Sequence, residues 1–246
     1  MHRRNFIVTS AGLLVAGAVA GHSLAAAAAA TAGPSSEAGS RAGPLQPPAS
    51  GPVRVAVAIA EGATVIDFCG PWEVFQDVML PSDHDGAMPF ELYTVATTRE
   101  PVRASAGLHI IPDFTVNDAP APNVIVVPAL RADDTLRAWI KETSGRTDLT
   151  MSVCTGAFQL ARTGLLDGLT ATTHHEFYEP FAHEFPKVSL VRNTRYVEHE
   201  RIATAGGLTS GIDLALRVVQ RYYGTDVAQR TAEYMEHQST RWLDPA

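Results

Sequence analysis

The sequence predicts an α/β domain in which helices cover both faces of a mostly parallel β-sheet. Three observations lead to this fold class: apolar runs of strand length, helical segments between them, and a cysteine directly after one such run. A strand that is apolar at nearly every position suits a sheet buried on both faces. Strands that alternate with helices form parallel sheets, whose ligands bind at the carboxyl ends of the strands.

The expected strands are short, nearly continuous apolar runs that are rich in valine and isoleucine. They span residues 53–60, 90–96, 123–127 and 149–153. β-branched side chains favour the extended backbone and pack well on a pleated surface. The last run leads straight into Cys154, which therefore lies at the carboxyl end of a predicted strand.

Two helices are expected after the first and third strands. Gly70-Pro71 predicts a helix start, because the missing N–H of a proline in the first turn costs no hydrogen bond. Asp133 and Asp134 favour a helix over 133–142, since carboxylates stabilise the positive end of a helix.

Two more helices are expected near the C-terminus. Thr209-Ser210 can cap a helix whose apolar residues recur with i, i+3, i+4 spacing and which Gly224 ends. A last helix is predicted over 226–236.

The start of the chain has the composition of an export signal. Arg3-Arg4 precedes an apolar stretch over 11–20 and an alanine run over 25–30. The arginine pair is similar to a twin-arginine signal, whose cargo crosses the membrane folded. The alternative is an uncleaved membrane anchor, for which the stretch is shorter than the ~20 residues required. We therefore expect residues 1–30 to be a cleaved signal peptide and the protein to be periplasmic or extracellular.

Residues 31–52 are rich in glycine, proline, serine and alanine, and we predict a flexible linker there. The folded domain is then 53–246. The net charge of −7 and the lack of a basic run disfavour binding to nucleic acids or anionic lipids. The expected partner is a small-molecule substrate, with no nucleic acid and no stable membrane association after processing.

The chain has two cysteines, Cys69 and Cys154, and two cysteines in an exported protein usually form a disulfide. Export of a folded protein and the position of Cys154 favour free thiols instead. An abrupt strand-to-helix turn projects the Cys154 side chain out of the sheet, as in nucleophile elbows. The helix N-terminus predicts a lowered thiol pKa, and the amides of Thr155 and Gly156 offer an oxyanion site. The alternative is a small buried core cysteine.

Asp67 is the candidate proton-transfer group. Its neighbours Ile66, Phe68 and Trp72 are apolar, and desolvation by such neighbours raises the pKa of a carboxyl group. The alternative is an aspartate that caps the helix after Gly70.

Three segments in order carry a family resemblance. Residues 67–75 read D-F-C-G-P-W-E-V-F, residues 152–157 read S-V-C-T-G-A, and residues 205–212 read A-G-G-L-T-S-G-I. Together they resemble the DJ-1/PfpI superfamily over residues 53–238, with the greatest similarity to its isonitrile hydratase-like branch.

The resemblance implies a flavodoxin-like three-layer sandwich, usually dimeric, with a cysteine nucleophile and no cofactor. It places the catalytic roles on Cys154, Thr155 and Asp67. The implied reaction is that of a lyase, addition of water to R–N≡C to give an N-substituted formamide. It also places His174 and Gly156 at the pocket.

The sequence departs from the pattern of the branch after the third strand. Where the branch has V-P-G-G, with a glycine amide at the oxyanion hole, this chain has Ala129 and Leu130 after Val127-Pro128. Of the neighbouring histidines His174 and His175, we expect one to face the cysteine and the other to point elsewhere. No histidine has the H-E-x-x-H spacing of a metal site, so no metal is expected.

The sequence leaves other functions open. Members of the superfamily include cysteine peptidases or amidases and glyoxalase-like enzymes. The peptidase branch has histidine directly after the cysteine, where this chain has Thr155. A non-enzymatic protein that senses oxidants through Cys154, or binds a ligand in its pocket, is the third alternative.

Overall fold

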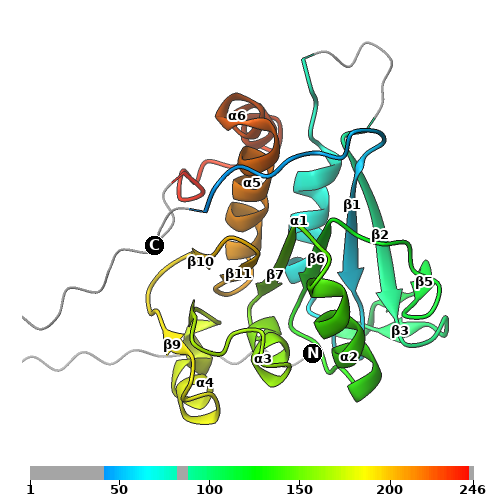
Figure 1. Ribbon diagram of the computed structural model, residues 1–246, viewed down its shortest axis with the longest axis vertical. Coiled ribbons are helices and arrows are strands. Elements are labelled where there is room, and N and C mark those ends of the chain that lie inside the picture. Colours follow the sequence, from blue (N-terminus) through cyan, green and yellow to red (C-terminus); the bar gives the residue numbers. More distant parts are fainter. Residues whose placement is uncertain (1–41, 82–87, 244–246) are drawn as a thin grey trace, which may run out of the picture. The chain divides into compact units, whose positions relative to one another are not determined.

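Short, almost fully buried strands form the central sheet in the order β10-β11-β7-β6-β1-β2-β5 (Figure 1). The computed structural model describes residues 42–81 and 88–243. The strands are β1 (Val53–Ala58), β2 (Phe90–Ala96), β5 (Phe114–Thr115), β6 (Val124–Val127), β7 (Leu149–Val153), β10 (Tyr196–Glu198) and β11 (Ile202–Ala205). Neighbouring strands are parallel except β10 and β11, which are antiparallel.

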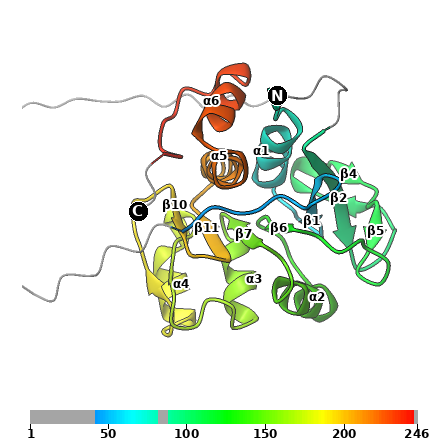
Figure 2. The same cartoon turned by 45° about the horizontal axis from the view of Figure 1, so that its top comes forward.

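Helices cover both faces of this sheet, which confirms the predicted three-layer α/β sandwich. The helices are α1 (Val65–Gln76), α2 (Asp134–Ser144), α3 (Gly156–Arg162), α4 (Tyr178–Glu184), α5 (Ser210–Tyr223) and α6 (Thr225–Tyr234). Figure 2 shows α1, α5 and α6 on one side of the sheet and α2, α3 and α4 on the other. Every residue of β6 and β7 is buried between these layers, as their apolar sequences require.

Short elements connect the main ones. They are the antiparallel ribbon β3 (Val102–Arg103) and β4 (His109–Ile110), the parallel pair β8 (Thr170–Ala171) and β9 (Ser189–Leu190), and the 3₁₀ turns η1 (Ser105–Gly107) and η2 (His175–Phe177). The sequence did not predict these elements, because strands of two residues leave no periodic pattern.

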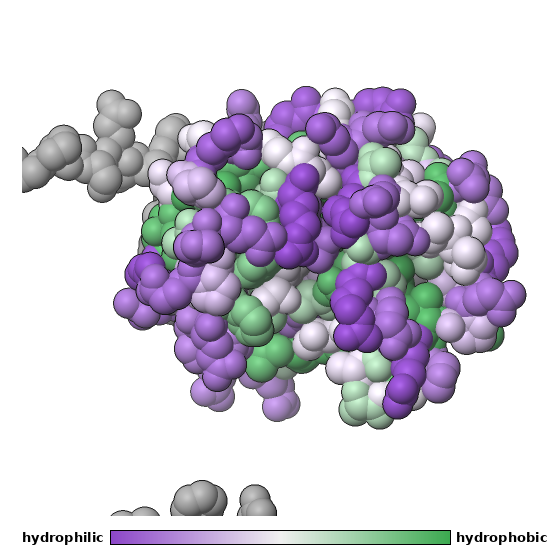
Figure 3. All heavy atoms as spheres, turned by 90° about the horizontal axis from the view of Figure 1, so that it is seen from below, coloured by the Kyte–Doolittle hydropathy of each residue, from purple (hydrophilic) through white to green (hydrophobic). Residues whose placement is uncertain are grey.

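The strand order reverses beside β1, and this creates the crevice that holds the site. The chain runs outward from β1 to β2 and β5, and then returns to β6 on the other side of β1. Such a switch point opens a crevice at the carboxyl ends of the strands. Asp67 follows β1, Ala129 follows β6 and Cys154 follows β7. Figure 3 looks onto the end of the molecule at which β1 and β2 terminate, where hydrophobic side chains surface between hydrophilic ones.

Most predicted elements agree with the structure. The expected strands over 90–96 and 149–153 coincide with β2 and β7. Asp133 caps α2, because its carboxylate accepts a hydrogen bond from the amide of Leu136 at 2.8 Å. Gly224 ends α5 as predicted, whereas Thr209 precedes that helix without a capping bond from its side chain.

The predicted start of α1 is wrong. The helix begins at Val65, and Pro71 is buried inside it rather than in its first turn. Pro71 cannot donate the hydrogen bond that the carbonyl of Asp67 would otherwise accept. Packing of the Pro71 ring against Gly211 of α5 compensates for this lost hydrogen bond. The contact is close, because a Cβ added to Gly211 would lie 3.3 Å from the Pro71 Cγ.

Part of the predicted linker is described, and it contacts α5. Arg221 donates to the carbonyl of Gly43 at 2.9 Å, Arg217 donates to that of Ala42 at 3.3 Å, and Leu45 donates from its amide to Arg221. The predicted signal peptide over 1–30 lies outside the described residues. Within those residues, no helix has the length and apolar character that a membrane crossing requires.

Candidate active site

Cys154 occupies a strained turn between β7 and α3. Its φ of 59° lies in the left-handed region, which residues other than glycine rarely adopt. The surroundings hold it there, because its amide donates to the carbonyl of Gly206 at 2.8 Å and its carbonyl accepts from the Thr173 hydroxyl at 2.9 Å. A backbone strained in this way at the end of a parallel strand is the geometry of a nucleophile elbow. The thiol is buried, with 7% of Cys154 exposed.

The elbow requires glycine at position 156. A Cβ on Gly156 would lie 2.1 Å from the carbonyl oxygen of Val127 and 2.9 Å from that of Pro128. Both contacts are with backbone, which cannot move aside as a flexible side chain would. The end of β6 therefore packs directly against the first residue of α3, and this contact sets the position of Cys154.

We expect Gly156→Ala to destabilise the fold by about 3 kcal/mol, because overpacking against backbone displaces the strand end. Urea unfolding measures the change. Gly145→Ala is the matched control, since Gly145 has a helical backbone and the nearest atom to its added Cβ is 3.4 Å away. Equal stability of the two variants would contradict a tight contact between β6 and α3.

Asp67 lies in the first turn of α1 with its side chain fully buried. Its Oδ2 accepts a hydrogen bond from the amide of Ala129 at 3.2 Å, and the Leu208 amide and the Cys154 thiol lie close enough to the carboxyl group to affect its pKa. The residue before the helix is Thr64, so Asp67 is not the helix cap that the sequence left open.

Burial raises the pKa of Asp67 from 3.8 to about 6, although the amides of Ala129 and Leu208 and the Cys154 thiol oppose the rise. This confirms the predicted direction. A pKa of about 6 is close to neutral pH, so the carboxyl group can both accept and return a proton under those conditions.

The thiol of Cys154 differs from the expectation. Burial, and then the negative charge of Asp67, raise its pKa above the ordinary value, while the amides of Thr155 and Leu208 lower it. The predicted lowering by a helix N-terminus is therefore wrong, because α3 has only seven residues and desolvation outweighs its dipole. These two shifts favour a pair in which the sulfur keeps its proton and Asp67 is the group that ionises first.

The other predicted site residues surround this pair. Ala129 and Leu130 are both buried, and neither has a positive φ, so this turn does not need the glycines found in the branch. The Ala129 amide donates its hydrogen bond to Asp67, so it positions the carboxylate and is not a free donor for an oxyanion. The Thr155 and Leu208 amides are the ones that act on the sulfur.

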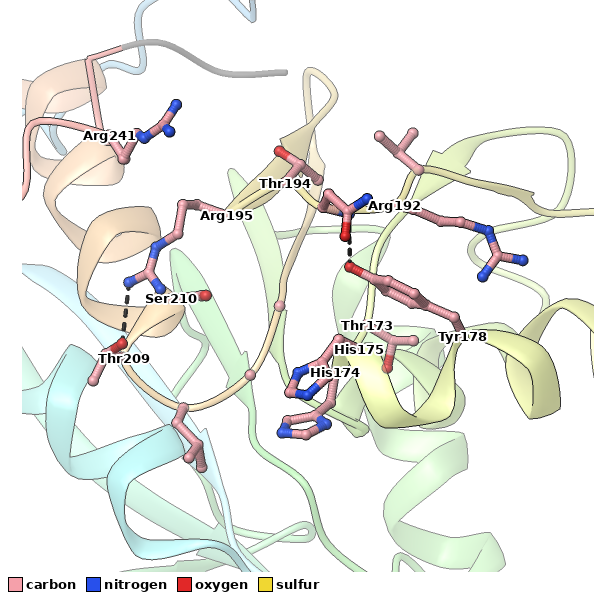
Figure 4. A pocket seen from close by; sticks show the side chains of 15 residues that line it. Thr173, His174, His175, Tyr178, Arg192, Thr194, Arg195, Thr209, Ser210 and Arg241 are labelled. Carbon is pink, nitrogen blue, oxygen red and sulfur yellow. Dashed lines mark hydrogen bonds between the residues drawn. The ribbon is translucent and has the colours of Figure 1, made fainter. Parts of the chain in front are cut away.

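Two cavities border the Cys154 turn, although neither Cys154 nor Asp67 is among the lining residues of either one. One, of about 420 Å³, is lined by residues that include Leu130, Thr155 and Phe177. The other, of about 810 Å³, is lined by residues that include His174 and Leu208 (Figure 4).

The second cavity corrects the expectation for the two histidines. His174 and His175 both line it, with ring centroids 4.5 Å apart in a stacked arrangement, so they do not point to different places. The His174 ring packs tightly on the chain at Gly207, where an added Cβ would lie 2.2 Å from its Cδ2.

Sequence reasoning missed Leu208 and Thr173. Leu208 has a φ of 53°, which turns its amide toward the Cys154–Asp67 pair. Its neighbours in A-G-G-L-T-S-G were noted only for their resemblance. Thr173 supports the Cys154 carbonyl from a segment 19 residues away.

Both cysteines are free thiols, as predicted. Within residues 42–81 and 88–243 no histidine, cysteine or acidic cluster has the arrangement of a metal site.

Comparison with known proteins places these features in a family. The model of the DJ-1/PfpI family matches residues 53–221. The chain is 31% identical over 179 residues to an isonitrile hydratase of Pseudomonas putida, covering 70% of this chain and 73% of that protein. It is 24% identical over 200 residues to the HTH-type transcriptional regulator GbdR of Pseudomonas aeruginosa (strain UCBPP-PA14), covering 79% of this chain but 53% of the regulator.

A solved structure agrees. The crystal structure of a THiJ/PfpI family protein from Pseudomonas syringae superimposes with a TM-score of 0.67 at 27% identity, over 79% of this chain and 77% of that one.

Proposed function

The chain belongs to the DJ-1/PfpI family, and from that premise we propose that it is a cysteine-dependent hydratase. The substrate would be a small isonitrile, R–N≡C, converted with water to the formamide R–NH–CHO. The observation that carries the proposal is the buried pair of Cys154 and Asp67 at the switch point of the sheet. The similarity to an isonitrile hydratase supports the choice of substrate class.

The resting proton distribution suits the first step. Sulfur attacks the terminal carbon of R–N≡C while Asp67 takes the S–H proton and delivers it to that carbon, which gives the thioimidate R–N=CH–S–Cys154. The S–H bond breaks, and one C–S and one C–H bond form. The amides of Thr155 and Leu208 stabilise the charge that develops on the sulfur, since both favour its anionic form.

Water completes the reaction. Asp67 accepts a proton from a water molecule that adds to the thioimidate carbon and passes this proton to the nitrogen, which gives the tetrahedral adduct R–NH–CH(OH)–S–Cys154. Collapse breaks the C–S bond, releases R–NH–CHO and returns the proton to sulfur through Asp67. Asp67 thus carries each proton in this sequence, while the sulfur at the elbow forms and breaks the covalent bond to carbon.

The test is a direct assay with a small alkyl isonitrile in H₂¹⁸O. We expect enzyme-dependent loss of the isonitrile and a formamide that carries one ¹⁸O atom, both measured by mass spectrometry. Casein and methylglyoxal serve as substrates for the peptidase and glyoxalase alternatives. Turnover of either of these without formamide production would replace the proposed reaction.

A ligand sensor is the second candidate. Its support is the similarity to a transcriptional regulator, of which this chain spans about half, and the raised pKa of Cys154, which slows reaction at the thiol. Ligand binding without turnover in the same assay would favour it.

As the family resemblance implies, we also propose that the protein acts as a homodimer.

We propose that the protein is exported through the signal at its start. Replacing Arg3 and Arg4 by lysine is expected to leave the protein in the cytoplasm at full length, because the twin-arginine route reads the arginine pair. Cell fractionation followed by intact-mass measurement checks this. The matched control replaces Arg41, which lies outside the signal. Normal export of the double-lysine variant would exclude the twin-arginine route.

A further inference from the structure

The cavity of about 810 Å³ is basic, although the chain as a whole has a net charge of −7. Its lining includes three arginines and two histidines, and among the described residues no aspartate or glutamate lines it. The basic residues are Arg192, Arg195, Arg241, His174 and His175. Arg192 and Arg195 are each paired with a carboxylate outside the lining, so among the described residues Arg241 carries the unpaired positive charge that attracts an anionic ligand.

Arg195 is a built part of this cavity. Its Nε donates to Oδ2 of Asp213 at 2.5 Å, and its Nη2 donates to the Thr209 hydroxyl at 3.2 Å (Figure 4). Asp213 is fully buried in α5, and its other oxygen is bonded to His237 at 2.8 Å. The buried carboxylate therefore fixes the direction of the guanidinium, and a group positioned in this way loses little entropy when it binds a ligand.

Arg241 supplies a free charge on the same side of the cavity. Figure 4 shows it on the Arg195 side, across the cavity from Tyr178. Among the described residues it has no ion-pair partner, and its one hydrogen bond is from its backbone amide to Ser239. Arg192 differs, because it is paired with Glu179 at 2.9 Å and its side chain points away from the cavity in Figure 4.

Polar donors and a helix end complete the same side. Thr209 and Ser210 line the cavity at the start of α5, a helix of 14 residues whose positive end therefore faces it. Two arginines, hydroxyl groups and a helix end together match the two oxygens of a carboxylate.

The cavity adjoins the elbow. Its lining residue Gly206 accepts the hydrogen bond from the Cys154 amide, and its lining residue Thr173 donates to the Cys154 carbonyl. A ligand held by Arg195 and Arg241 would therefore lie against the turn that carries Cys154, whose own side chain is not part of the lining.

We propose that this cavity binds the carboxylate of a small organic acid, so that the substrate used by Cys154 is an isonitrile that carries an acid group. The second half of this statement rests on the proposed function, whereas binding of the acid does not.

Binding is tested first with a stable acid. N-formylglycine is the formamide that hydration of isocyanoacetate would produce, and N-formylglycinamide is its uncharged counterpart. Isothermal titration of the full protein is expected to show binding of the acid and at least about 10-fold weaker binding of the amide, as the loss of a charge-assisted hydrogen bond implies. Equal affinities, or stronger binding of inorganic phosphate than of the acid, would overturn the proposal.

Arg241→Gln tests whether acid binding depends on this cavity or only on the overall charge of the protein. It is expected to weaken binding of N-formylglycine by about 10-fold or more and to leave the amide unchanged. Arg230→Gln is the matched control, because Arg230 is exposed on α6. Arg195→Lys is a second variant, read together with its melting temperature since Arg195 also pairs with buried Asp213. Unchanged acid binding in both cavity variants would sink the proposal.

A kinetic comparison links the cavity to turnover. The ratio of kcat/KM for isocyanoacetate to that for isocyanoacetamide is expected to exceed 10 in the natural protein and to fall toward 1 in Arg241→Gln. Acid binding without any isonitrile turnover would contradict the hydratase but keep the carboxylate site. Turnover with a ratio near 1 in both proteins would contradict the acid-bearing substrate, whereas the titration decides on the carboxylate site itself.

Discussion

Replacing Cys154 by serine is expected to abolish isonitrile hydration while the protein remains folded. Serine is nearly isosteric with cysteine and keeps the amide and carbonyl that hold the turn to Gly206 and Thr173. Its hydroxyl is a much weaker acid than a thiol, and a carboxylate whose pKa is about 6 is too weak a base to activate it. We expect the rate to fall by about 10⁴-fold or more, as for removal of other enzymatic nucleophiles.

Formamide production at high enzyme concentration measures this loss. Cys69→Ser is the matched control, because Cys69 is a free, half-buried thiol on α1 that has no part in the proposed reaction. The control should keep full activity. If Cys154→Ser retained a tenth of the activity, catalysis would not pass through a covalent bond to sulfur, and Asp67 would have to activate water directly.

The fold was predictable where the sequence is locally consistent. β2 and β7 match their predicted bounds because β-branched and apolar residues predominate in each strand and most of their positions are buried. The start of α1 was not predictable, since a buried Pro71 inside a helix depends on packing against Gly211, far away in the sequence. β10 and β11 went unnoticed because their short polar-containing sequences show no pattern until they pair with each other and with β7.

The candidate site was predictable in its members but not in its electrostatics. Cys154 and Asp67 each carry a local signal, a strand-to-helix turn and an apolar neighbourhood, and the switch point brings the two together. Whether the thiol pKa rises or falls depends on the balance between a short helix, burial and a carboxylate 87 positions earlier in the chain, which only the assembled structure sets.

The basic cavity shows the same limit. Arg195, Arg241 and His174 lie in three separate segments, and none is unusual within its own segment. Asp213 lies within the helix that the sequence predicts after Thr209-Ser210 and has no signal of its own, yet it fixes Arg195 and His237 at once. A pocket made by residues from distant segments leaves no motif, so its charge becomes visible only in three dimensions.

Replacing Asp67 by asparagine is expected to separate turnover from thiol reactivity. Without a carboxylate to move the S–H proton, turnover should fall by about 10²- to 10⁴-fold, the usual contribution of general acid–base catalysis. Alkylation of Cys154 by iodoacetamide at pH 7.5 should become faster, because the charge of Asp67 raises the thiol pKa and asparagine removes that charge. Mass spectrometry of the labelled cysteine measures the second effect, and Glu73→Gln on the same helix is the control, since its carboxylate acts on the pKa of Cys69 instead.

The ionised Asp67 that turnover requires should lower the stability of the fold at neutral pH. Its pKa is 3.8 in the unfolded reference and about 6 in the fold, so between these pH values the folded protein binds more protons and stability falls as pH rises. Asparagine avoids burying the charge and can still accept the hydrogen bond from the Ala129 amide. Asp67→Asn is therefore expected to be more stable than the natural protein at pH 7, by about 2–3 kcal/mol in urea unfolding, and equally stable at pH 3.5.

Activity of the natural protein should follow the same carboxyl group. The rate is expected to decline as the pH falls through about 6, because protonated Asp67 can no longer accept the proton of the thiol. This decline should be absent from the residual activity of Asp67→Asn. Slower alkylation in Asp67→Asn would show instead that Asp67 donates a proton to a resting thiolate, and unchanged turnover would leave Asp67 as a buried structural group whose ionisation only lowers stability.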